Sequence, residues 1–259
     1  LGLLNLKCHL IDNLDKIGGQ CAELYPEKPV YDIPSRPRIT GEELISELIL
    51  QAKPFEPVFH LNQQADSIEK VGEEWKLTTS SNTVIQARCI VIAAGAGSFV
   101  PRRPPIKNIE LFENTSVFYS VRDKSKFKDK KILIVGGGDS ALDWTNDLAS
   151  IAEVTLMHRR KEFRASPDSV TKMLELEKNN KIKFVFGQLD SLSGNEKNLN
   201  TVKYKHEDEE FSIEVDYLLP FFGLKMELGP IANWGINLHE NLIKVDTEKF
   251  ETSVPSIFA

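Results

Sequence analysis

A glycine-rich turn carries the clearest chemical signal in the sequence. Residues Gly136-Gly137-Gly138-Asp139-Ser140-Ala141 follow an apolar run and precede a helical pattern, and they match the G-x-G-x-x-A form of dinucleotide sites. The first glycine permits the tight turn, the second lets the backbone approach a pyrophosphate, and the small third residue lets helix and strand pack closely. The free amides at the helix start suit phosphate groups. The pattern predicts a nucleotide site formed by Gly136, Gly138, Asp139, Ser140 and Ala141; the alternative is a plain strand-to-helix turn.

A cluster of cations ends the next apolar run. His158, Arg159 and Arg160 stand there, and Arg164 follows. NAD enzymes carry an acid about 20 residues after the first glycine, where it binds the ribose hydroxyls. Cations in that place suit the 2′-phosphate of NADP instead. The cluster therefore favours NADP(H), with a solvated basic turn as the alternative.

An acidic residue ends an earlier apolar run. Asp12 follows the run 7–11, and Gly18-Gly19-Gln20 follow shortly afterwards. A carboxylate at a strand end suits the ribose hydroxyls of a second dinucleotide, and its glycine loop should lie about 20 residues upstream. That place is before Leu1. We therefore expect the chain to begin inside a nucleotide-binding domain and to be a fragment.

The elements that must position these residues alternate in the second half. A strand at 131–135, a helix at about 139–150 and a strand at 154–157 predict a β-α-β unit. Ser166-Pro167 forms an N-cap and N1 pair for a helix that ends near residue 178. Further strands are predicted at 182–186, 201–206 and 211–217.

The first half mixes loops, one helix and short strands. The glycine pair at 18–19 predicts a loop, and Thr40 with Glu43 forms a capping box before an amphipathic helix. Prolines at 101–105 and the segment 223–235 predict two crossings between domains. Small antiparallel strands are predicted at 58–61, 65–71, 75–79 and 83–93.

Composition excludes several classes of protein. The 259 residues are 41% hydrophobic and 27% charged, which is typical of a globular chain with a core. The net charge of -6 gives no electrostatic reason to bind nucleic acid or an anionic membrane. No apolar run approaches the roughly 20 residues of a membrane-spanning helix. The cysteines Cys8, Cys21 and Cys89 lack the spacing of a metal site or disulfide framework, so we expect no metal and a cytoplasmic location.

Taken together, these motifs resemble the thioredoxin-reductase-like flavoproteins. The segments that carry the resemblance are Gly18-Gly19-Gln20, Ala93-Ala94-Gly95, the turn 136–141 and the basic cluster 158–164. The stretch 18–32, with Leu24-Tyr25-Pro26-Glu27-Lys28, is similar to one branch, the thioredoxin-reductase-type ferredoxin-NADP(+) reductases. The resemblance implies an α/β fold with two Rossmann-like nucleotide-binding domains and small antiparallel β insertions. It assigns 1–115 and 226–259 to an incomplete FAD domain and 116–225 to a complete NADPH domain, in a chain truncated at both ends.

The resemblance also implies cofactor contacts. FAD would be bound by Asp12, Gln20, Tyr25, Ala65 and Phe99. NADPH would be bound by the turn 136–141 and by His158, Arg159, Arg160 and Arg164. The flavin carries the chemistry, so no catalytic side chain is expected, and the fragment alone is expected to be inactive.

The positions of the cysteines indicate which kind of electron acceptor the protein uses. Thioredoxin reductases need a Cys-x-x-Cys in the second domain, but no cysteine follows Cys89 here. The resemblance then implies hydride transfer between NADPH and FAD and one-electron exchange with ferredoxin, in a homodimer. Candidate docking cations are Arg102, Arg103, Lys107, Lys124, Lys126, Lys128, Lys130 and Lys131. The alternatives are an NADPH-dependent flavin or quinone reductase and a non-catalytic NADPH-binding module.

Overall fold

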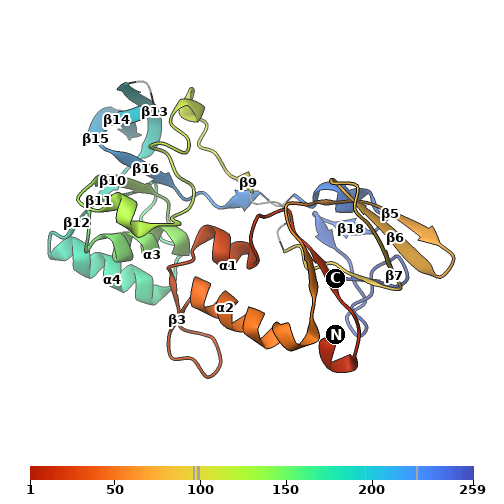
Figure 1. The fold of residues 1–259 in the computed structure, drawn as a ribbon. Helices are drawn as coiled ribbons and strands as arrows, with labels where there is room; N and C mark the ends of the chain where they lie inside the picture. The colour runs from red at the N-terminus through yellow and green to blue at the C-terminus, as the bar shows by residue number, and fades with distance from the viewer. Residues whose placement is uncertain (96, 98–99, 196, 226) are drawn as a thin grey trace. The chain divides into compact units, whose positions relative to one another are not determined.

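In the computed structural model, the chain forms two compact units, which are described separately (Figure 1). Unit 1 consists of residues 1–100 and 224–259, and unit 2 consists of residues 101–223. The structure describes all residues except 96, 98, 99, 196 and 226. Where the chain crosses between the units, β9 (Val100–Pro101) pairs with β17 (Leu224–Lys225). Unit 2 is therefore one continuous segment inserted into unit 1.

Unit 2 is built on a parallel sheet with the strand order β12–β11–β10–β16. Its strands are β10 (Lys131–Val135), β11 (Glu153–His158), β12 (Ile182–Phe186) and β16 (Tyr217–Pro220). The helices α3 (Asp139–Leu148) and α4 (Pro167–Lys178) connect consecutive strands and lie side by side (Figure 1). The predicted β-α-β unit is confirmed.

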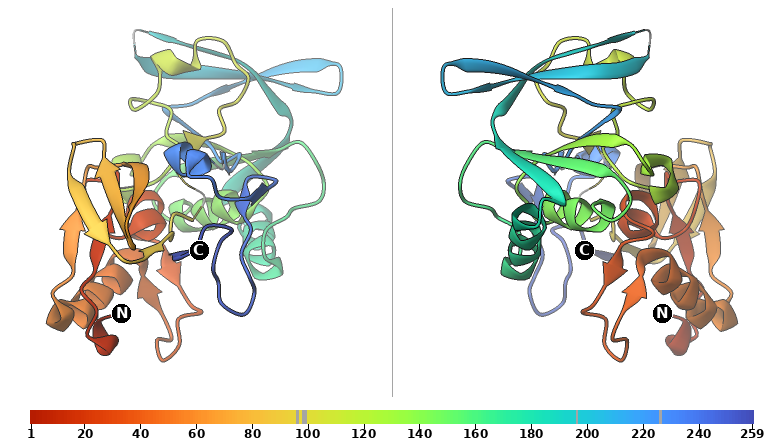
Figure 2. Two further views of the ribbon diagram at one scale, coloured as in Figure 1. Left: turned by 90° about the vertical axis from the view of Figure 1, so that its right-hand side faces the viewer. Right: turned by 90° about the vertical axis from the view of Figure 1, so that its left-hand side faces the viewer.

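The two faces of this sheet bury different partners. Leu133 and Val135 share one buried cluster with Leu199 and Val202. The latter two belong to a small antiparallel sheet of β13 (Gln188–Asn195), β14 (Asn198–His206) and β15 (Glu209–Glu214), which Figure 2 shows on the side away from α3 and α4. Because strand side chains alternate, Ile132 and Ile134 face the helices. The carboxyl ends of β10 and β11 are thus fixed from both sides.

The boundary between the units differs from the predicted one. Residues 101–115 were assigned to the first domain, but they pack in unit 2, where Ile109 and Phe112 are buried with Leu133 and Leu218. The second boundary falls at 223/224 instead of 225/226. The prolines at 101–105 indicate a crossing close to the observed one, but a proline-rich segment has no periodic pattern that shows which core the residues after it join.

Unit 1 combines short sheets with one long helix, α2 (Gly41–Ala52). Thr40 Oγ1 accepts from the Glu43 amide at 3.2 Å and Glu43 Oε2 accepts from the Thr40 amide at 2.8 Å, which confirms the predicted capping box. The remaining α-helix and strands that the structure describes in unit 1 are α1 (Gly19–Leu24), β1 (His9–Ile11), β2 (Pro29–Val30), β3 (Ile39–Thr40), β4 (Val58–His60), β5 (Ala65–Val71), β6 (Glu74–Thr79), β7 (Val84–Ala87), β8 (Ile90–Val91), β18 (Leu238–His239), β19 (Leu242–Ile243) and β20 (Ile257–Phe258). Short 3-10 helices lie at Gly2–Leu4, Lys53–Phe55 and Gly229–Asn233.

Three local predictions for unit 1 were wrong. The segment 58–61, expected to be antiparallel, forms β4, which pairs in parallel with β1. The run 83–93, expected as one strand, splits into β7, which pairs with β6, and β8, which pairs in parallel with β20. The glycine pair predicted a loop, but Gly19 begins the short helix α1. Gly18 takes φ 130° as the N-cap of that helix, a backbone conformation that favours glycine.

Candidate nucleotide-binding site

The turn between β10 and α3 requires glycine at its first position. A Cβ added at Gly136 would lie 2.7 Å from the carbonyl oxygen of Phe221 and 2.9 Å from the Cβ of Ala141. Ala141 itself is fully buried. The predicted close packing of helix on strand is therefore present, and it depends on two small residues facing each other.

The same turn presents backbone donors. Within the described residues, the amides of Gly137, Gly138, Asp139 and Ser140 donate no hydrogen bond. Gly138 is the N-cap of α3 without a side-chain cap, and a Cβ added there would meet nothing within 4 Å. An open approach to unused amides at a helix N-terminus is the arrangement that binds a pyrophosphate. The residues present fit a dinucleotide.

The cation loop, residues 159–165, follows β11 at the same edge of the sheet. Arg159, Arg160 and Arg164 are exposed. No acidic side chain in the described part of the chain pairs with any of these three guanidinium groups. Their positive charge is therefore available to a phosphate.

His158 lies between the turn and the cation loop. Its ring stacks on Phe163 with centroids 5.2 Å apart, and its Nε2 lies 3.2 Å from the carbonyl oxygen of Glu162. A Cβ added at Gly137 would collide with this ring. Burial lowers the pKa of His158 from its ordinary value, and the neighbouring arginines lower it further against the opposing effect of the Glu162 carbonyl. His158 is therefore a neutral packing group at pH 7.

Backbone contacts join the cation loop to the turn. The Arg164 amide donates to the carbonyl oxygen of Gly137 at 2.7 Å, and the Ser166 amide donates to Asp139 Oδ1 at 2.8 Å. Ser166 is the N-cap of α4, as predicted. The structure thus brings the predicted residues of unit 2 together at one edge of the sheet.

In unit 1, Asp12 follows β1 and is anchored by its backbone. Its amide donates to the carbonyl oxygen of His60 at 3.0 Å, and its carbonyl oxygen accepts from the Gln63 amide at 3.0 Å. Its carboxylate accepts from the Leu14 amide at 3.1 Å. Ala65 begins β5 just beyond these contacts. The structure therefore places Asp12 beside the segment that leads to Ala65.

Gln20 and Tyr25 lie on and just after α1. A Cβ added at Gly95 would lie 3.7 Å from Nε2 of Gln20, so Gly95 and the residue that follows the glycine pair are neighbours. Burial, together with the nearby Cys21 thiol, raises the pKa of Tyr25. Phe99 lies outside the described residues.

Several of the candidate docking cations are already paired. Arg103 lies 2.7 Å from Glu113, Lys124 lies 2.9 Å from Asp147, and Lys131 lies 3.0 Å from Glu214. Lys126 lies over the Phe118 ring at 3.9 Å. Much of the expected positive charge is therefore compensated within unit 2, and docking at these residues stays a prediction.

Comparison with known proteins decides the family. The family model described as pyridine nucleotide-disulphide oxidoreductase matches residues 23–259. The chain belongs to this family. The curated relatives include the ferredoxin–NADP reductases of Parvibaculum lavamentivorans, 55% identical, and Nitrobacter hamburgensis, 53% identical. Each match covers 100% of this chain, and 76% and 77% of the respective relative. The resemblance drawn from the sequence is confirmed, and the family is one of oxidoreductases.

Solved structures show the same fold. The thioredoxin reductase of Lactococcus lactis superposes with a TM-score of 0.84 at 24% identity, over 99% of this chain and 82% of that one. The thioredoxin reductase of T. acidophilum gives 0.83 at 22% identity, over 97% of this chain and 80% of that one. The predicted thioredoxin-reductase-like α/β fold is confirmed.

Two residues of the site were missed in the sequence, and a third, Gly137, was included in the turn 136–141 without a role of its own. The carbonyl oxygen of Gly137 accepts from the Arg164 amide, and its missing side chain makes room for His158. Asp143 and Ser169 connect α3 to α4. The spacing of Asp139 and Asp143, one helical turn apart, places both on one face of α3, but nothing in the sequence pairs that face with Ser169.

Proposed function

We propose that the chain is the nucleotide-binding part of a ferredoxin–NADP reductase that uses FAD and NADP(H). The observation that carries the proposal is identity above 50% over the whole chain to curated proteins of that name. The cation loop at the end of β11 supports the choice of NADP(H), since it offers uncompensated arginines where a 2′-phosphate would lie.

The residues of unit 2 have distinct roles in this proposal. The amides of Gly138, Asp139 and Ser140 bind the pyrophosphate, and Ala141 lets α3 approach β10. Arg159, Arg160 and Arg164 bind the 2′-phosphate. His158 holds the cation loop against Gly137 and takes no proton in the reaction. No side chain of unit 2 is required to form or break a bond.

The residues of unit 1 would hold FAD. Asp12 keeps a carboxylate oxygen for the ribose hydroxyls while the other accepts from the Leu14 amide. Gln20, Tyr25 and the backbone at Ala65 are the other FAD contacts that we propose in the described part of unit 1, and Phe99 would complete the set. Held by these residues, FAD would supply a hydride acceptor that can also exchange single electrons. The side chains of the protein orient the two cofactors.

The decisive experiment uses the whole protein that contains this chain, loaded with FAD. We expect a flavin absorption spectrum and NADPH-dependent reduction of a plant-type or bacterial [2Fe–2S] ferredoxin, with NADH much less effective. Reduction of free flavins or quinones at equal or greater rates, with no ferredoxin reduction, would instead support the diffusible-acceptor alternative. Binding of NADPH without any flavin would support the non-catalytic module.

Two finer properties are also proposed. A cytoplasmic location is supported by the three free thiols, Cys8, Cys21 and Cys89, which suit a reducing compartment. In the described part of the chain, no helix is long and apolar enough to cross a membrane. A homodimer is supported by the family resemblance alone. Sedimentation velocity on the protein with FAD tests it, and a monomer across the micromolar range would contradict it.

A further inference from the structure

The geometry points to Asp143 and Ser169 as positioning residues that hold the cation loop in place and so set the preference for a 2′-phosphorylated nucleotide. The inference rests on the proposed function, because it assigns a task to residues that lie behind the NADP site. Neither residue belongs to the glycine turn or the cation loop. They act through the first turn of α4, which begins where that loop ends.

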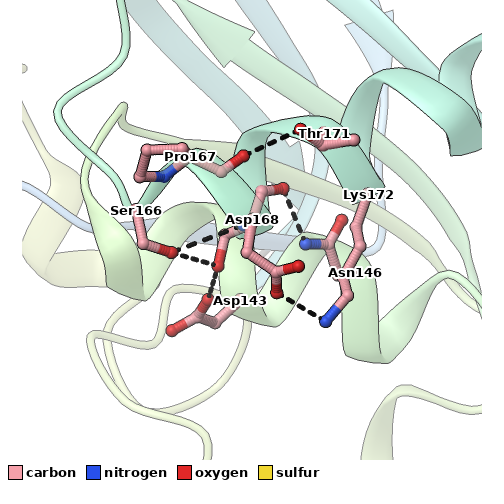
Figure 3. Close-up of polar contacts among 8 residues, drawn as sticks. Asp143, Asn146, Ser166, Pro167, Asp168, Thr171 and Lys172 are labelled. Atoms are coloured by element: carbon pink, nitrogen blue, oxygen red, sulfur yellow. Dashed lines mark hydrogen bonds and ion pairs between the residues drawn. The ribbon is translucent and has the colours of Figure 1, made fainter.

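A directed chain of hydrogen bonds runs through this turn. Ser169 Oγ donates to Asp143 Oδ1 at 2.6 Å, and Ser166 Oγ lies 3.0 Å from Ser169 Oγ (Figure 3). A carboxylate only accepts, so the single hydroxyl hydrogen of Ser169 goes to Asp143 and Ser166 must donate to Ser169. Ser166 Oγ then keeps a lone pair for the Ser169 amide, at 3.4 Å. The charge of Asp143 therefore orients the hydroxyls of Ser169 and Ser166.

These hydrogen bonds lead to the end of the cation loop. Ser166 also donates its amide to Asp139 Oδ1, and Arg164, two residues earlier, donates its amide to Gly137. Asp139 and Asp143 are one helical turn apart on α3. One face of α3 thus holds the end of the cation loop at two successive turns.

A third polar contact continues this face. Asn146 Nδ2 donates to the carbonyl oxygen of Ser169 at 3.0 Å, while Asn146 Oδ1 is buried without a hydrogen-bond partner in the described residues. Ser169 is only 9% exposed. A buried polar atom without a hydrogen-bond partner lowers the stability of the fold, whereas an apolar contact between the helices would not. These hydrogen bonds are directional, so they fix the position of the first turn of α4 relative to α3. The exposed arginines just before that turn can then occupy fewer positions.

The test measures binding of NADP+ and NAD+ separately, by calorimetry on the full chain, so that no turnover is needed. Ser169→Ala and Asp143→Ala should each raise the Kd of NADP+ by about three- to tenfold, the size of one lost hydrogen bond. The Kd of NAD+ should change less than twofold. Asp143→Asn keeps an acceptor oxygen and should restore most of the affinity for NADP+.

A matched control lies on the same helix. Thr171 Oγ1 donates to the carbonyl oxygen of Pro167 on the exposed side of α4 (Figure 3), so Thr171→Val removes a hydroxyl without touching α3. It should leave both Kd values unchanged. Thermal unfolding of each variant shows whether it folds, and Asp143→Asn provides a milder perturbation if an alanine variant does not.

The outcomes separate this inference from the proposed function. If the unmodified chain binds NADP+ and NAD+ equally well, the NADP assignment fails and this inference fails with it. If the unmodified chain prefers NADP+ and the alanine variants keep the full preference, or weaken both nucleotides alike, only the positioning role is overturned.

Discussion

The strands β1 and β11 both end at candidate nucleotide sites, but with opposite charges. Asp12 follows β1, whereas His158 ends β11 and Arg159 and Arg160 come next. The Asp12 carboxylate accepts from the amide of Leu14, two residues away. The two arginines have no ion-pair partner in the described residues. The contacts of their loop are made by its backbone and by the ring of Phe163, which packs on His158 and Phe184.

The two strand ends differ in how they would position a charged side chain next to the ribose of a bound nucleotide. A short acid can be oriented by its own turn, because its carboxylate reaches a nearby amide. Long arginines at exposed positions cannot, so their placement depends on the backbone that carries them. Selectivity in unit 2 therefore depends on the contacts of the whole loop, while unit 1 relies on one residue and its turn.

Reversing the charge at the end of β11 should have the largest effect. Arg159→Glu should abolish the preference for NADPH over NADH, which we expect to be roughly tenfold to several hundredfold, since each charge-assisted bond contributes about 1.5 to 3 kcal/mol. The measurement is kcat/KM for both nucleotides. Lys181→Glu makes the same charge change near the start of β12 and should leave the preference intact. Equal use of NADPH and NADH by the unmodified protein would refute the assignment.

Alanine substitutions at Gly136 and Gly138 should distinguish an effect on stability from an effect on nucleotide binding. Gly136→Ala forces a Cβ against Phe221 and Ala141, so we expect a loss of about 1 to 3 kcal/mol in the free energy of unfolding. Gly138→Ala places a Cβ in open space and should leave stability nearly unchanged while weakening NADP+ binding. Denaturant titration and calorimetry measure the two effects. Equal stability losses in both variants would contradict the close packing at Gly136.

Removing the charge of Asp12, at the end of β1, should weaken the binding of FAD and leave the binding of NADP+ unchanged. Asp12→Asn keeps an oxygen for the Leu14 amide but removes the charge, so FAD should bind about tenfold more weakly. The Kd of NADP+ should not change. Fluorescence titration with FAD measures the first and calorimetry the second. A change in NADP+ affinity with FAD unaffected would reverse the roles of the two units.

The smallest expected effect is the pH dependence from His158. Burial lowers its pKa in the folded protein below the ordinary value of 6.5, so the unfolded chain binds the proton more readily. This histidine therefore costs stability as the pH falls below 6.5 and costs none above it. His158→Gln should reduce the loss of stability between pH 7 and pH 5.5. An unchanged slope for His158→Gln would show that its ring is not buried in solution.

The features predicted well from the sequence are local ones. The turn 136–141, the N-cap at Ser166 and the capping box of Thr40 and Glu43 each depend on residues within a few positions of one another. Their signals are complete in a short window, because a cap or a tight turn is stabilised by its own neighbours.

The features that were missed depend on distant partners. The run 83–93 is continuously strand-like, and only the pairing of β8 with β20 shows why it breaks in two. The segment 101–115 carries no pattern that distinguishes the core of unit 2 from that of unit 1. Likewise, Asp143 and Ser169 attract attention only when α3 and α4 lie side by side. Tertiary contacts of this kind leave little trace in the local sequence.

The pairing of β8 with β20 also sets an order of events during synthesis. Ile90 and Val91 emerge from the ribosome well before Ile257 and Phe258, with all of unit 2 between them. Unit 2 is continuous and can fold while this partner is still missing, whereas β8 must wait with an unpaired edge. An exposed strand edge invites pairing with other chains. Slow elongation between residues 101 and 223 would therefore prolong the interval in which nascent chains are most prone to aggregate.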